Sequence, residues 1–76
     1  MIKEGTILIA KDECVMENGS NKGKASLKIG DEYPIERVDA WGVCIINERG
    51  DYHTFNLSES EEDYWGNFFD IKPKIT

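Results

Sequence analysis

The sequence predicts a mostly β protein with a single domain over residues 1–76. We expect a small, partly open barrel of five strands with one short helical turn near the C-terminus. Residues 27–55 contain short runs of β-branched and aromatic residues, which are typical of strands. Gly-bearing loops separate these runs and allow antiparallel strands to reverse. Because a flat sheet of this size would leave its edges exposed, the strands should curl towards closure.

The first two strands are predicted from different patterns. Residues 5–11 are nearly continuously apolar, as in a strand that is covered on both faces. Residues 27–35 lead into the second strand, with Gly30 at a turn. Pro34 has no N–H to donate, so this strand should lie at an edge or contain a bulge there.

A long, mobile loop is predicted between these strands. Residues 12–25 are rich in turn-forming residues and include the dipeptide Asn18-Gly19. Val15 and Met16 are apolar, and we expect them to anchor this loop to the body of the protein.

Two hairpins follow the loop. The first is expected to close over residues 39–42 and the second over residues 48–50. Gly50 can adopt a positive φ, which suits a bulged loop of three residues. A two-residue loop would prefer Asn-Gly or Asp-Gly, and the chain has Arg49-Gly50.

The C-terminal tail predicts a helical turn and a last strand. Ser58 and Glu61 have the spacing of a capping box, so a helix should begin at Ser58. Gly66 and Asn67 should limit this helix to a turn or two. Residues 68–72 then predict the last short strand.

The aromatic residues divide into two groups. Trp65 is expected to close the open end of the barrel, together with neighbouring rings of the tail, which are Tyr64, Phe68 and Phe69. Trp41 lies in a hairpin loop, where a core residue is not expected. Its ring is interpreted either as an exposed anchor for a partner or as a cover folded over its own hairpin.

Composition limits the partners. Fifteen acidic and nine basic residues give a net charge of −6, which opposes direct binding to nucleic acid. Lys22, Lys24 and Lys28 form a local basic cluster that is too small to offset these acids. The sequence has neither a run long enough to span a bilayer nor a signal-peptide pattern at its start. We therefore expect a cytoplasmic protein that does not bind membranes.

Enzymatic chemistry is not predicted. In the register of a three-residue second loop, Ile45 faces His53 and Cys44 faces Thr54, so the only imidazole and Cys44 point to opposite faces. His53 is expected to be a half-buried structural residue beside Phe55. Ligand spacings for zinc or calcium are absent, and no cofactor or metal site is predicted. Cys14 and Cys44 are expected to stay unpaired in a reducing compartment.

Five motifs in the chain resemble those of small uncharacterised SH3-like barrel proteins of bacteriophages and bacterial mobile elements. They are KEG at 3–5, VMENG at 15–19, LKIGDEYPI at 27–35, ERGDYHTF at 48–55 and EEDYW at 61–65. The chain departs from the group at Tyr52 and Thr54, where Glu and Tyr are usual, and in having Trp41 at the first hairpin tip. The resemblance implies an SH3-like barrel and a phage-type origin, and supplies no catalytic residue.

These observations favour a small non-enzymatic interaction module that binds a host or phage protein in the bacterial cytoplasm. We expect a monomer or a weak homodimer. The alternative is an acidic nucleic-acid mimic that inhibits a host DNA-binding or defence protein. The residues predicted to form the binding surface are three aromatics and four acids, namely Tyr33, Trp41, Tyr52, Glu59, Glu61, Glu62 and Asp63.

Overall fold

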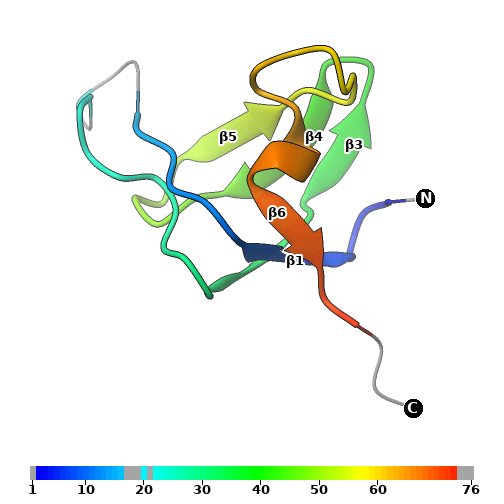
Figure 1. Ribbon diagram of the computed structural model, residues 1–76, viewed down its shortest axis with the longest axis horizontal. Helices are drawn as coiled ribbons and strands as arrows, with labels where there is room; N and C mark the ends of the chain where they lie inside the picture. The colour runs from blue at the N-terminus through cyan, green and yellow to red at the C-terminus, as the bar shows by residue number, and fades with distance from the viewer. Residues whose placement is uncertain (1, 17–19, 21, 74–76) are drawn as a thin grey trace.

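The computed structural model describes residues 2–16, 20 and 22–73, and its fold is mostly β, as predicted (Figure 1). The described strands form two three-stranded antiparallel sheets that do not close into a barrel. The strands are β1 (Ile7–Ala10), β2 (Glu32–Pro34), β3 (Arg37–Asp39), β4 (Gly42–Ile46), β5 (Tyr52–Phe55) and β6 (Phe69–Ile71). The predicted count of five strands is therefore wrong by one.

The first sheet has the order β2-β1-β6, and the second has the order β3-β4-β5. The second is a meander of sequence neighbours, whereas β1 lies between β2 and the last strand, with Leu8 opposite Ile71. In Figure 1 the meander occupies the upper half of the view, and β1 and β6 lie below it. Pro34 ends β2, which is an edge strand, in agreement with the expectation for a residue without an N–H.

The additional strand arises because the chain changes sheets between Ile35 and Glu36. The N–H of Ile35 donates to the carbonyl oxygen of Thr6, which precedes β1, at 2.8 Å. The N–H of Glu36 donates to the carbonyl oxygen of Cys44 in β4, also at 2.8 Å. Consecutive residues thus bond to different sheets. A run that the sequence pattern presents as continuous is divided into β2 and β3 by this bend.

The core lies between the two sheets. Leu8 and Ala10 of β1 point into it, while Ile7 and Ile9 on the other face of this strand are only half-buried. The rings of Phe55 and Phe69 meet edge-on at a centroid distance of 5.0 Å. The other buried members of the cluster are Leu27, Tyr33, Ile35, Val43 and Ile45.

The predicted helix at Ser58 is wrong. The helical turn is a 3₁₀ helix, η1, at Trp65–Asn67, which includes the two residues expected to end a helix. The N–H of Asn56 donates to the carbonyl oxygen of Asp63 at 2.7 Å, and the N–H of Trp65 donates to that of Asn56 at 3.0 Å. These bonds fix both ends of residues 57–63, which form turns instead. Within the described residues, no helix has the length and apolarity needed to cross a membrane.

The loop after β1 is tied to itself and to the body. Val15 and Ala25 form an antiparallel bridge, and the N–H of Met16 donates to the carbonyl oxygen of Lys24 at 2.9 Å. Met16 is half-buried and acts as the predicted anchor, because the side-chain amide of Asn47 donates to its sulfur at 3.1 Å. Val15 is exposed instead. The turn predicted at residues 18–19 lies outside the described residues.

Candidate functional site

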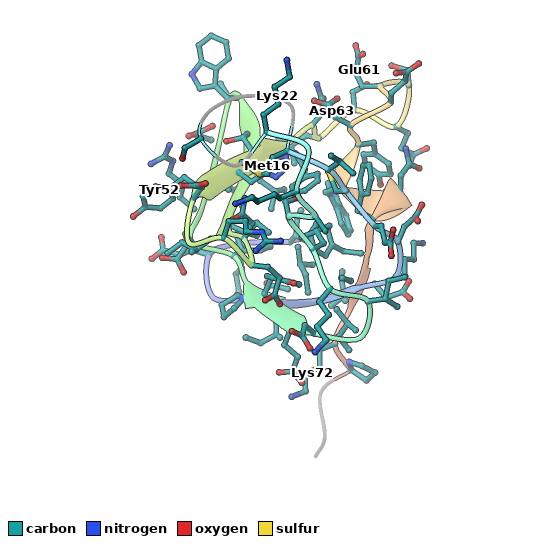
Figure 2. All side chains as sticks on the ribbon, turned by 90° about the vertical axis from the view of Figure 1, so that its left-hand side faces the viewer. Met16, Lys22, Tyr52, Glu61, Asp63 and Lys72 are labelled. Atoms are coloured by element: carbon teal, nitrogen blue, oxygen red, sulfur yellow. The ribbon has the colours of Figure 1, made fainter. Side chains whose placement is uncertain are left out.

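A hollow of about 340 Å³ opens between the loop after β1, strand β5 and the turn that follows β5. In Figure 2, Met16 lies between Tyr52 on one side and Asp63 on the other. Two of the predicted binding residues, Tyr52 and Asp63, are therefore brought to one site. The lining residues are Cys14, Val15, Met16, Tyr52, His53, Thr54, Phe55, Asp63 and Phe68.

Aromatic rings form the inner wall of this hollow. His53 stacks on Phe55 with a centroid distance of 4.3 Å and an interplanar angle of 22°. The ring centroid of Phe68 lies 5.3 Å from that of Phe55. Ile45 faces His53 and Cys44 faces Thr54, so the predicted register and the half-buried position of His53 are both confirmed. The sequence gives no sign that His53 also lines a hollow.

The four predicted acids, Glu59, Glu61, Glu62 and Asp63, are all exposed, and we refer to them as the acidic turn. Three other surface acids are paired: Glu32 with Lys72 at 3.0 Å, Asp39 with Arg37 at 3.2 Å, and Asp70 with Lys11 at 3.6 Å. In the part of the chain that the structure describes, no carboxylate of the acidic turn forms an ion pair. Among the described residues, the acidic turn therefore presents four carboxylates without an ion pair, and Asp63 brings it to the lining of the hollow.

Trp41 is 83% exposed in the turn between β3 and β4. The backbone N–H of Trp41 donates to one oxygen of the Asp39 carboxylate at 2.8 Å. The other oxygen of that carboxylate accepts a hydrogen bond from Arg37 Nε at 3.2 Å. The exposed ring was one of the two interpretations of the sequence, and the structure excludes a ring folded over its own hairpin. Trp41 does not line the hollow.

Tyr52 is 67% exposed and marks the start of β5. The Arg37 guanidinium carbon lies 6.0 Å from the centre of its ring, a distance compatible with a cation–π contact. Since Arg37 is on β3 and Tyr52 is on β5, this side chain spans β4, where Cys44 is only 1% exposed. Cys44 is thus a covered structural residue.

Tyr33 is only 4% exposed, so its predicted place on a binding surface is wrong. Its hydroxyl donates to Glu48 Oε1 at 2.7 Å and accepts the backbone N–H of Lys28 at 2.8 Å. Burial raises the pKa of Tyr33 to about 12. A hydrogen bond from Asp31 lowers the pKa of Glu48 and raises that of Asp31. Tyr33 is a core residue with a satisfied polar end.

We expect Tyr33→Phe to cost ~1–3 kcal/mol in the free energy of unfolding, because the Lys28 N–H and the Glu48 carboxylate both lose their hydrogen bond to the Tyr33 hydroxyl. The pKa of Tyr33 is raised in the folded state, so its contribution is complete below pH ~10 and is lost as the pH rises towards ~12. Urea unfolding of both proteins at pH 8 and pH 11 tests this. An energy difference that grows at pH 11 would contradict it.

Among the described residues, no group of three or more His, Cys, Asp or Glu side chains is arranged to hold a metal ion. The hollow offers an apolar wall, one imidazole and one carboxylate, which suits the binding of a side chain better than its chemical conversion. The chain matches no protein-family model, no curated protein and no solved structure.

Proposed function

We propose that this protein is a small non-enzymatic module that binds a protein partner, with Trp41 as a principal contact. The observation that carries the proposal is the 83% exposure of the Trp41 ring on a turn held by the Asp39 carboxylate. Tryptophan is enriched among the residues that dominate binding energy at protein interfaces.

We further propose that the fold is an SH3-like barrel whose second strand is bent. The bonds made by Ile35 and Glu36 carry the chain from β2 in one sheet directly to β3 in the other, so the proposed barrel treats β2 and β3 as the two parts of one bent segment. The pairing of β1 with β6 brings the first and last strands together, as in a barrel that is partly open. The resemblance of the sequence motifs to those of phage proteins supports a phage-type origin and a bacterial cytoplasmic setting.

Two observations favour a binding role over catalysis. Cys44 and His53 lie on opposite faces of their sheet, so they cannot act as a nucleophile and its base. The His53 ring also lies flat against Phe55, as a packed structural residue does.

The test is capture of a partner by the immobilised protein from a bacterial lysate, followed by mass spectrometry. We expect Trp41→Ala to keep the fold and to lose the partner. Ile71→Ala is the matched control, since Ile71 is another exposed apolar residue and lies on the other sheet. Equal loss of the partner in both variants, or retention by Trp41→Ala, would refute the proposed role of Trp41.

The acidic-mimic alternative is distinguished by salt. An acidic mimic should associate with its host protein much more slowly when the Debye length falls from ~10 Å at 0.1 M salt to ~3 Å at 1 M salt. Duplex DNA should also compete with the mimic for the captured host protein.

A further inference from the structure

Strand β5 has one free edge, because it is the last strand of the β3-β4-β5 sheet. The N–H of Asn47 donates to the carbonyl oxygen of Asp51 at 2.9 Å. This bond determines which residues of β5 direct their backbone N–H and C=O groups towards β4. In an antiparallel pair every second residue bonds to the partner strand, so His53 and Phe55 face β4. The backbone groups of Tyr52 and Thr54 consequently point to the free edge.

The described part of the chain contains no hydrogen-bond partner for these outward N–H and C=O groups of Tyr52 and Thr54. The next outward residue, Asn56, is already used: its N–H donates to Asp63 and its carbonyl oxygen accepts from Trp65, in a parallel bridge centred on Tyr64. The chain itself therefore pairs with this edge at one end. The remaining two residues form a short, open pairing site.

The hollow adjoins this open edge, since both Tyr52 and Thr54 line it. Met16 and Phe68 give it apolar walls, and Asp63 brings the acidic turn to its rim. A volume of about 340 Å³ is at the lower end of ligand pockets, which suits a single side chain. Main-chain bonds at the edge and one side chain in an adjacent pocket are the two parts of recognition by strand addition.

We propose that the edge of β5 at Tyr52 and Thr54 binds an extended segment of the partner protein as an added strand. The segment places one apolar side chain in the hollow and a Lys or Arg against the acidic turn. This proposal rests on the proposed protein-binding function and names the chemistry of the partner. Charge favours a basic partner over a second copy of the chain, because each copy carries a net charge of −6 and two copies repel each other.

The test is NMR titration of the intact protein with a short end-blocked peptide that has a central Leu, alternating Thr and two flanking Lys. We expect the amide signals of Tyr52 and Thr54 to shift and their hydrogen exchange to slow. The same peptide with both Lys replaced by Glu should bind at least about tenfold more weakly, as should a version with N-methylated backbone amides. Failure of the Lys peptide to bind, or shifts confined to other strands, would overturn the proposal.

Thr54→Pro removes an outward N–H, and Thr54→Ala is its control because it removes only the side chain. Proline is tolerated on an edge strand where the N–H faces solvent, so both variants should fold, as a thermal melt will check. We expect Thr54→Pro to bind the Lys peptide about tenfold more weakly than Thr54→Ala does, because both variants remove the Thr54 side chain from the lining of the hollow and only the proline also lacks the N–H. Equal binding by both variants would refute strand addition.

Further outcomes distinguish strand addition at β5 from the protein-binding function on which it rests. Self-association that is lost in Thr54→Pro would make a second copy the occupant of the edge, which overturns the proposal. Capture of the same lysate protein by Thr54→Pro and by the unmodified protein would reject the edge while leaving the Trp41-based function intact. Absence of any captured partner that depends on Trp41 would refute the function itself.

Discussion

Replacing Gly42 with Ala is expected to unfold most of the protein at room temperature. A Cβ at this position would overlap the backbone carbonyl oxygen of Phe55 on the neighbouring strand. The φ of Gly42 is +136°, a conformation that costs a residue with a side chain on the order of 1–3 kcal/mol. Relief of the overlap requires β4 and β5 to separate. The combined cost reaches the ~3–5 kcal/mol that a core of this size provides.

Gly50→Ala is the matched control for this prediction. Gly50 also has a positive φ, of +81°, but apart from its two chain neighbours no atom of the described residues lies within 4 Å of an added Cβ. We expect only the conformational cost of ~1–2 kcal/mol. Thermal melts followed by circular dichroism compare the two variants, and equal melting temperatures would show that the contact with Phe55 has no effect.

Phe55→Ala is expected to have the second-largest effect. Phe55 is 1% exposed, and its ring contacts those of His53, Phe68 and Phe69. Truncation of such a residue typically costs ~3–5 kcal/mol, because it removes buried area and leaves a cavity. The variant should therefore be largely unfolded, with a urea transition that is shifted close to zero denaturant.

Trp65→Ala provides the comparison, because the sequence predicts Trp65 as the residue that closes the barrel. In the structure Trp65 is only half-buried and packs against the edge of the core, while Phe55 and Phe69 fill its centre. We expect Trp65→Ala to stay folded with a smaller loss of stability than Phe55→Ala. A stable Phe55→Ala beside an unfolded Trp65→Ala would reverse this assignment.

Local rules predicted the second hairpin in detail. Gly50 adopts the positive φ of a bulged three-residue loop, and the register that follows from it places Cys44 and His53 as observed. The position of Trp41 in the turn between β3 and β4 also followed from local order, but the sequence left open whether its ring is exposed or folded over the hairpin. In each case neighbouring residues determine the geometry.

Features that depend on distant residues could not be predicted. The change of sheet at Ile35 is decided by its bond to Thr6, which no local pattern encodes. The capping-box spacing at Ser58 was overridden by the pairing of Asn56 with the tail. Tyr33 was predicted on the surface, and its burial depends on distant residues, since its ring packs edge-on against Phe69 at a centroid distance of 5.9 Å.

In the candidate site, too, single residues could be predicted from local patterns, but their arrangement depends on distant parts of the chain. Tyr52 and Asp63 were predicted as separate surface residues, but the hollow between them exists only because the loop at Met16 folds back to Asn47. The free edge of β5 requires the order of the strands, which follows from the whole chain.

The two sheets differ in the sequence separation between their paired strands, and this difference determines the order in which the sheets can assemble. The β3-β4-β5 meander joins neighbours through short turns, so it can form as soon as residues up to Phe55 are free to move. The β2-β1-β6 sheet instead requires closure of the long loop that brings Phe69–Ile71 back to Ile7–Ala10. Contacts of high sequence separation slow folding, since the entropy of closing the loop is lost before the contacts repay it. The transition state of folding should therefore contain the meander, with β1 and β6 joining afterwards.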